Sequence, residues 1–212
     1  MQPLLDNDVI VKTASFSLVA ELDRLLRSNG AKRPYRCVPA AFGSLRLSDK
    51  IPLYTKFYAS DDVRKDAYVM YAMCESLPPG AVDAERLKRL AAIPGIDDGE
   101  ARFIDYACAN PDTLIISGDG RCIRALANAP LLADVCTQLK GRFVHFDTLL
   151  EGVAAMSKFA IVRERVLTAP TVDRGLTVAL DDTHSETTAR ENLGRRIATL
   201  EVEALGLLRT AF

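Results

Sequence analysis

Four acidic residues fall where the ends of expected strands and the starts of expected helices should converge: Asp6, Asp8, Glu100 and Asp119. Clustered carboxylates repel one another and resist joint ionisation unless a cation neutralises them. Because hard divalent ions such as Mg²⁺ and Mn²⁺ take oxygen ligands, a convergent group of this kind is a candidate metal site. A metal held there can lower the pKa of an attacking water and stabilise the charge that develops on phosphate oxygens. The pattern therefore suits phosphodiester cleavage.

Two short apolar runs carry three of these acids. The stretch TLIISGDGRCIRAL (residues 113–126) indicates a buried strand that ends before Asp119 and is followed at once by a helix. The opening segment PLLDNDVIV has the same form, with Asp6 and Asp8 closing its apolar run. Ligands of an open parallel sheet lie outside the carboxyl ends of its strands, so the two segments predict one shared acidic pocket.

The segments around these strands show the helical spacing of apolar residues. Helices are predicted up to the stop signal Asn29-Gly30, over 61–77, 83–92 and 98–109, and then as two short helices separated at Pro130. The segment RFVHF (142–146) indicates a last strand, with His145 in the core or at its rim. This alternation predicts an α/β fold, a three-layer sandwich with a mainly parallel sheet. We expect residues 1–150 to form that domain and 151–212 to form a helical C-terminal extension.

The C-terminal extension predicts helix over 149–166, a linker at 168–170 and a long helix over 186–208. The long helix carries an apolar stripe that includes Leu193, Ile197 and Leu200. Such a stripe packs on its own domain, forms a subunit interface as in a homodimer, or binds a partner protein. The sequence leaves these alternatives open.

The charge balance gives no global signal for nucleic-acid binding. Lys and Arg number 27 against 28 Asp and Glu, a net charge of -1, so any basic contact surface must be local. The basic stretch over 32–46 predicts a loop followed by a short amphipathic helix, with a nucleic-acid contact surface as the alternative. Five scattered cysteines without a CxxC pair favour free thiols in a reducing compartment. Without a leader-like start or an apolar run of membrane-helix length, we expect a cytoplasmic protein with no membrane contact.

Three segments, in order along the chain, resemble those of the PIN domain family: LLDNDVIV, IDDGEARFIDYA and TLIISGDGRCIRAL. The similarity covers about residues 3–150, since GRFVHFDTLL also resembles the closing strand and helix of that family. The resemblance matches Asp6 to the first acid of the family, Glu100 to its helix acid and Asp119 to its strand acid. Asp8 falls where the family often carries Asn beside the metal. Ser117 matches a small hydroxyl residue just before the acidic turn.

The resemblance implies a metal-dependent nuclease, a family that most often acts on RNA and includes many toxins of bacterial toxin–antitoxin pairs. We therefore expect an Mg²⁺- or Mn²⁺-dependent endoribonuclease that hydrolyses single-stranded RNA. The three matched acids are expected to be catalytic metal ligands, with Asp8 as a further direct or water-mediated ligand. Ser117 and Arg121, and also Arg124, are expected to contact substrate. An antitoxin or another protein is the expected protein partner.

The sequence departs from the family pattern at one acid. The family usually brings another Glu after its first long loop, where this chain reads VPAAFGSLRL (38–47) with no acid. The nearest acids in the sequence, Asp49, Asp66 and Glu75, are imperfect substitutes for this Glu. Asp8, Asp97 or Asp98, which lie next to the matched acids in the sequence, could supply the missing negative charge instead. The alternative function is therefore a PIN-like fold without catalysis, which serves as a binding or assembly module through its C-terminal helix.

Each acid also has a purely structural interpretation. Asp97 and Glu100 have the spacing of a helix capping box. Asp119 lies between two glycines, where an Asp favours a turn by hydrogen-bonding its own backbone. Asp8 can cap the helix that follows, and Asp6 can brace the N-terminus of that helix. The catalytic hypothesis rests on the conjunction of three acids, in order, in three separate elements.

Overall fold

The computed structural model describes residues 1–36, 58–78 and 83–209, and its architecture is α/β. Within these residues, five strands form one sheet in the order β3-β2-β1-β4-β5, and every neighbouring pair is parallel. The strands are β1 (Gln2–Leu5), β2 (Tyr35–Arg36), β3 (Glu75–Ser76), β4 (Thr113–Ser117) and β5 (Phe143–His145). The predicted α/β class with a mainly parallel sheet is confirmed.

The two central strands, β1 and β4, fix the position of the acidic residues that follow them. Leu4 pairs with Ile115 and Leu5 with Ile116, so the two strands run side by side and end at the same edge. Leu5 and Ile116 face one hydrophobic core, whereas Leu4 and Ile115 face the other. Strands buried on both faces read as continuous apolar runs, and for this reason the sequence predicted them correctly.

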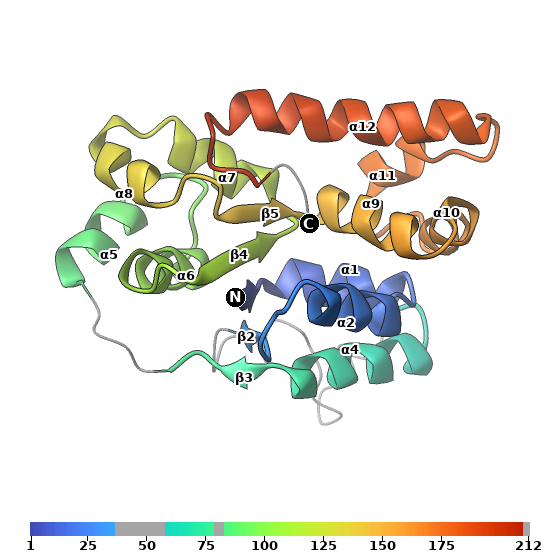
Figure 1. Cartoon of the computed structure of the whole chain (residues 1–212), viewed down its shortest axis with the longest axis horizontal. Coiled ribbons are helices and arrows are strands. Elements are labelled where there is room, and N and C mark those ends of the chain that lie inside the picture. The colour runs from blue at the N-terminus through green and yellow to red at the C-terminus, as the bar shows by residue number, and fades with distance from the viewer. Residues whose placement is uncertain (37–57, 79–82, 210–212) are drawn as a thin grey trace.

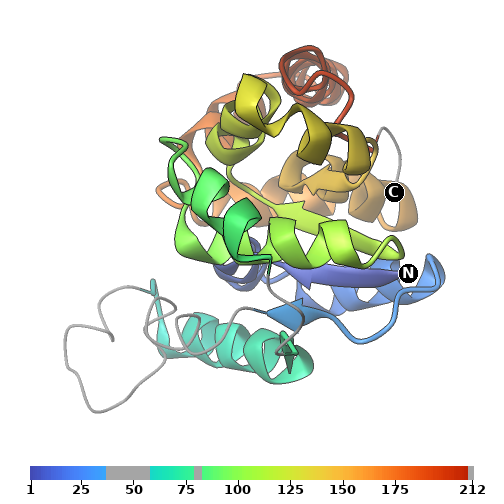
Figure 2. The ribbon, with the colours of Figure 1, turned by 90° about the vertical axis from the view of Figure 1, so that its left-hand side faces the viewer.

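The helices cover both faces of the sheet. Their bounds are α1 (Asn7–Ser15), α2 (Val19–Ser28), α4 (Asp61–Met73), α5 (Ala84–Ala91), α6 (Asp98–Ala109), α7 (Gly120–Ala127), α8 (Ala133–Gln138), α9 (Phe146–Met156), α10 (Phe159–Leu167), α11 (Arg174–Ala179) and α12 (Glu186–Glu203), with a 3₁₀ turn, η2, at Pro130–Leu132. Helices α5 to α8 lie on one side of the sheet, and α1, α2, α4, α9 and α10 lie on the other (Figure 1). Two orthogonal views place α4 beyond the β3 edge and α12 beyond the β5 edge (Figure 2). This arrangement is compatible with a three-layer sandwich.

The predicted helix over 98–109 is confirmed at both ends, whereas the helix expected over 61–77 and the loop expected near Tyr35 need correction. The helix over 61–77 ends at Met73, and the residues beyond it include β3, the edge strand of the sheet. The loop expected near Tyr35 contains β2, while the rest of that prediction and Asp49 lie outside the described residues. A strand of two residues is too short to show an alternating pattern, and only its neighbours in the fold define it.

The C-terminal extension departs from its predicted outline at three places. The helix expected over 149–166 is two helices, α9 and α10, interrupted at Ser157. The segment after the expected linker contains α11. The long helix ends at Glu203 rather than at Leu208, because Leu205 and Gly206 have φ of 50° and 87° and turn the chain back. Leu208 then forms a parallel bridge with Phe143, beside β5.

The apolar stripe of α12 packs against the rest of the chain. Leu193 and Ile197 belong to the core on the α1 side of the sheet, and Leu200 belongs to the core on the α6 side. Val202 and Leu205 are exposed. The predicted division after residue 150 falls inside α9, and residues on both sides of it share the same two cores. No helix within the described ranges is long and apolar enough to cross a membrane.

Candidate active site

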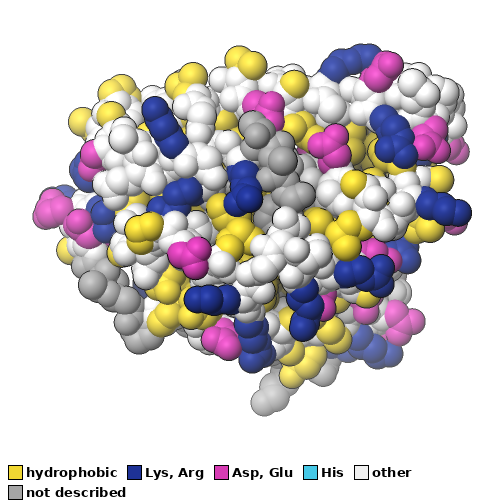
Figure 3. All heavy atoms as spheres, viewed as in Figure 1, with side chains coloured by type: hydrophobic (Ala, Val, Ile, Leu, Met, Phe, Trp, Pro, Cys, Tyr) yellow, Lys and Arg dark blue, Asp and Glu magenta, His cyan; other side chains and the backbone are white. Residues whose placement is uncertain are grey.

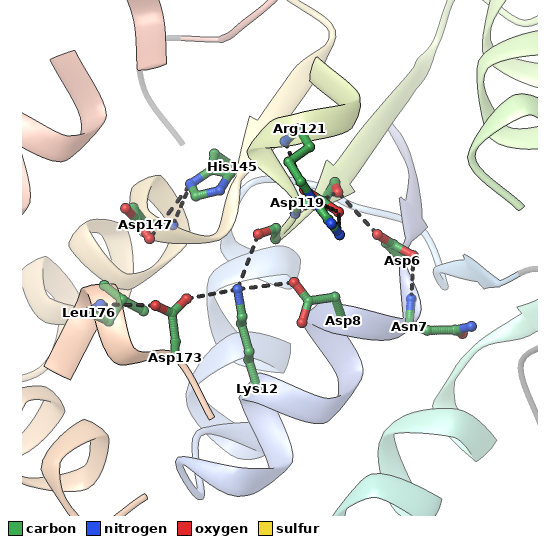
Figure 4. A network of polar contacts seen from close by, with 12 residues as sticks. Asp6, Asn7, Asp8, Lys12, Asp119, Arg121, His145, Asp147, Asp173 and Leu176 are labelled. Atoms are coloured by element: carbon green, nitrogen blue, oxygen red, sulfur yellow. Dashed lines mark hydrogen bonds and ion pairs between the residues drawn. The ribbon is translucent and has the colours of Figure 1, made fainter. Parts of the chain in front are cut away.

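Two of the predicted acids stand at the carboxyl ends of the central strands. Asp6 follows β1 directly and caps α1, where its Oδ1 accepts a hydrogen bond from the Asn7 amide at 2.7 Å. Asp119 follows β4 after one intervening residue and caps α7, accepting from the Arg121 amide at 2.7 Å. The parallel pairing of β1 and β4 therefore brings the two carboxylates to one edge of the sheet (Figure 4).

Ser117 joins these two acids through its hydroxyl group. The hydroxyl donates to Asp6 Oδ2 at 3.1 Å and accepts from the Asp119 amide, also at 3.1 Å. Ser117 is the last residue of β4 and is buried, so its position is set by the sheet. The Ser117 hydroxyl, which was predicted to contact substrate, thus connects Asp6 to the turn that carries Asp119.

Glu100 has both the structural role and the location that the sequence suggested. It forms a capping box with Asp97: each backbone amide donates to the other's carboxylate at 2.8 Å. A small pocket of about 10 Å³, roughly the space of one water molecule, is lined by Glu100, Asp6, Ser117 and Cys122. The capping box therefore fixes Glu100 beside Asp6 rather than removing it from the site.

Asp6 and Glu100 are both partly buried, and their negative charges repel each other. Burial, followed by the charge of Asp8, raises the pKa of Asp6 to about 6. Burial also raises the pKa of Glu100 to about 7, and the charges of Asp97, Asp6 and Asp119 add to that rise. Both groups therefore release their protons more reluctantly than ordinary carboxyls, and a bound cation would lower both pKa values.

Asp119 is neutralised within the protein. Its burial favours the protonated form, but the hydrogen bonds and charge of Arg121 hold the pKa of Asp119 below its ordinary value. Arg121 Nη2 lies 2.6 Å from Asp119 Oδ2, although the Arg121 side chain is 83% exposed. Arg124, one turn further, pairs with Glu203 of α12 at 2.5 Å. The two arginines predicted to contact substrate are thus engaged by carboxylates.

Asp8 lies in the first turn of α1 and points to a different partner. Its Oδ2 is 3.0 Å from Lys12 Nζ, one turn along the helix. The same ammonium lies 2.8 Å from Asp173 Oδ2, at the start of α11, and donates to the Gly118 carbonyl at 3.1 Å. Asp6, not Asp8, caps α1, so the capping roles suggested by the sequence are exchanged between the two acids.

Lys12 is the functional residue that sequence reasoning missed. Its side chain is only 8% exposed, and although burial alone lowers the pKa of Lys12, the charges of Asp8 and Asp173 raise it overall. The spacing of Asp8 and Lys12 along one helix face is a signal that could have predicted their pairing. Asp173 carries no comparable signal, because its contact with Lys12 spans most of the chain.

Gly118 must lack a side chain for this arrangement to form. A Cβ atom at this position would overlap Asp8 Oδ2 and lie 3.0 Å from Lys12 Nζ. The glycine before the acidic turn therefore reflects close packing of the turn on α1.

A second buried ion pair lies behind the turn. Arg196 of α12 bonds Asp147 Oδ2 at 2.9 Å and lies 4.0 Å from Asp173. Asp147 is 3% exposed, and its amide donates to the Nδ1 atom of His145, which caps α9. Burial lowers the pKa of His145. His145 is thus a buried residue at the end of β5, as predicted.

The donor set fits a hard divalent cation in its chemistry, because Asp6, Glu100 and Asp119 offer only oxygen atoms. With the side chains as they stand, however, no three His, Cys, Asp or Glu residues among 1–36, 58–78 and 83–209 are grouped to hold a metal ion. Of the substitutes for the missing family Glu, Glu75 opens β3 at the amino edge of the sheet and pairs with Arg33. Asp97 lies close enough to raise the pKa of Asp6.

No protein-family model, curated protein or solved structure matches this chain.

The raised pKa of Asp6 makes the stability of the metal-free protein depend on pH. The folded Asp6 carboxyl binds its proton more tightly than the unfolded one, so the contribution of Asp6 to stability falls as pH rises from about 4 to about 7. Asp6→Asn, which keeps a capping side chain, should raise the free energy of unfolding by about 1–2 kcal/mol at pH 8 and change it little at pH 4. Urea denaturation in the presence of a chelator measures this. Asp23→Asn, in a surface pair with Arg27, is the matched control, and a destabilised Asp6→Asn protein at pH 8 would contradict the expectation.

Replacing Lys12 should be costly, because Asp8 and Asp173 would then lose the ammonium that lies between them. We expect Lys12→Met to lower the free energy of unfolding at pH 7 by about 3 kcal/mol or more. The control is Lys65→Met, which removes an exposed lysine paired with Asp62 and should change stability by less than about 0.5 kcal/mol. Equal effects of the two substitutions in urea denaturation would show that the buried bridge contributes nothing particular.

Proposed function

We propose that this chain is a metal-dependent endoribonuclease with a PIN-like fold, acting on single-stranded RNA in the cytoplasm. The observation that carries the proposal is the convergence of Asp6, Glu100 and Asp119 on one edge of an all-parallel sheet. These acids come from three separate elements, in the order that the resemblance to PIN domains requires. The choice of RNA rests on that resemblance, and the described cysteines, which are all free, fit a reducing compartment.

In this proposal Asp6, Glu100 and Asp119 hold Mg²⁺ or Mn²⁺, with Asp8 as an outer ligand. The cation, when bound, lowers the pKa of an attacking water and offsets charge on the phosphate oxygens. Ser117 keeps Asp6 and the Asp119 turn in register, and Lys12 holds the Gly118 carbonyl of the same turn. Asp119 would hold the cation in place of its pair with Arg121, and the exposed guanidinium of Arg121 would then contact a phosphate.

The alternative is a binding or assembly module of the same fold without catalysis. Two observations favour it: Arg121 already neutralises Asp119, and VPAAFGSLRL contributes no acid. The two functions differ in whether the carboxylates are needed for a metal-dependent reaction.

Cleavage of a labelled single-stranded RNA separates the two functions. We expect cutting by the wild type with Mn²⁺ or Mg²⁺ but not with EDTA, and a loss of about 100-fold or more in Asp119→Asn and Asp6→Asn. Asp134→Asn, which removes an equally charged residue from an exposed pair with Arg89, should cut like the wild type. Equal cutting by all variants, or no cutting with any metal, would exclude the catalytic function.

A toxin of a toxin–antitoxin pair is the biological role that we propose for the nuclease, with an antitoxin as its protein partner. Expression of the wild type in a bacterial host should then arrest growth, because uncontrolled RNA cleavage stops translation. Asp6→Ala should relieve the arrest at an equal protein level, and growth curves together with immunoblots measure both. Arrest that persists in Asp6→Ala would mean that toxicity, if any, comes from something other than the acidic site.

A further inference from the structure

A second, larger hollow lies behind the acidic turn. Its volume is about 420 Å³, within the range of ligand pockets, and it opens between the turn at 118–120, the end of β5 and the helices α11 and α12. Six of its lining residues matter here: Gly118, Gly120, Arg124, Arg195, Arg196 and Thr199. The nuclease proposal does not use this pocket.

The charges that face the pocket leave two guanidinium groups for a ligand. Its acidic lining residues, Asp147 and Asp173, are held by Arg196 and Lys12. Arg124 and Arg195 are 44% and 71% exposed, and their partners, Glu203 and Glu191, do not line the pocket. Because Arg195 lies 3.4 Å from Glu191, the weaker of the two pairs, its guanidinium is readily available to an anion.

The pocket is positioned directly beside the proposed reaction site. Gly118 and Gly120 flank Asp119, so the same turn separates the pocket from Asp6 and Glu100. A Cβ atom on Gly120 would lie 3.1 Å from Arg124 Nη1 and 3.4 Å from Leu200 Cδ1, which shows how closely α12 packs on this turn. A chain of phosphates that reached the acids would pass next to Arg124 and Arg195.

A local site of this kind is needed if the protein binds RNA at all. The net charge of the chain is -1, and Lys or Arg side chains alternate with Asp or Glu over the face seen in Figure 3. The net charge therefore gives no global attraction for a polyanion, and binding would rest on locally placed basic side chains.

We propose that this pocket binds a backbone phosphate of single-stranded RNA next to the phosphate that is cut. Arg124 and Arg195 contact the phosphate, and Arg196 is a positioning residue that holds α12 against Asp147. The inference rests on the proposed nuclease function, which it extends by assigning part of the substrate site to the C-terminal extension. The extension lies outside the resemblance to PIN domains.

Binding of a fluorescein-labelled single-stranded RNA in EDTA, read by anisotropy over a series of KCl concentrations, tests the pocket without cleavage. Arg124→Gln/Arg195→Gln should weaken binding by about tenfold at low salt and reduce the slope of log K against log salt by about 1.4, since each phosphate contact contributes about 0.7. Arg195→Gln alone, which removes the pair with Glu191 inside α12, should reduce the slope by about 0.7 and guards against misfolding of the double variant. Arg27→Gln/Arg89→Gln removes two paired surface arginines away from the pocket and should bind like the wild type.

The outcomes separate this inference from the nuclease proposal. If the pocket variants bind RNA as tightly as the wild type, or the control binds equally weakly, the pocket assignment is wrong even where Asp119→Asn abolishes cleavage. If the wild type binds no RNA, the assignment is also wrong. If the pocket variants lose affinity with the expected change in slope but the wild type never cuts, the pocket stands and the nuclease function does not.

Discussion

The buried ammonium of Lys12 connects the three parts of the molecule that form the acidic edge. It touches Asp8 in its own helix, the Gly118 carbonyl after β4 and Asp173 at the start of α11. A charge with so little exposed surface is tolerated only when its partners compensate for lost hydration, and two carboxylates and a carbonyl do so here. The same contacts fix the turn that carries Asp119. Helix α1, the turn after β4 and the start of α11 in the C-terminal extension are therefore tied together at this edge.

Each acid of the candidate site has a structural role at the start of a helix as well as a proposed chemical role. Asp6 caps α1, Asp119 caps α7 and Glu100 belongs to the capping box of α6. A helix N-terminus favours a nearby carboxylate through its free amides and dipole, so capping places each acid at a defined position. Burial, and then the charges of neighbouring acids, raise the pKa of Asp6 and Glu100, so ionising these carboxyls in the folded protein costs stability. A fold that needed caps alone would have no reason to bring them together, and this is the physical basis for reading the cluster as functional.

The sequence predicted the parts whose signal is local. The central strands are continuous apolar runs, and α6 has a capping residue at its start and Asn110-Pro111 at its end, so their bounds could be read directly. The strands β2 and β3 could not, because two residues show no periodicity and only their pairing defines them as strands: β2 pairs with β1, and β3 pairs with β2. The location of Asp6 and Asp119 followed from strand ends. The partners Asp173 and Arg196 did not, because their contacts join segments far apart in the chain and leave no spacing pattern, whereas the i,i+4 spacing of Asp8 and Lys12 is a local signal for that one pair.

The C-terminal extension supplies residues that support the acidic edge of the sheet. Residues 1–150 contain the segments that resemble a PIN domain, but Asp173 and Arg196 complete the ion pairs that support the Asp119 turn. The extension also shares both hydrophobic cores through Leu193 and Leu200. A helix that served only as a docking surface would keep its apolar stripe exposed, whereas in α12 the stripe is buried and two of its arginines face the hollow beside the acids. The geometry thus makes α12 one wall of the candidate site.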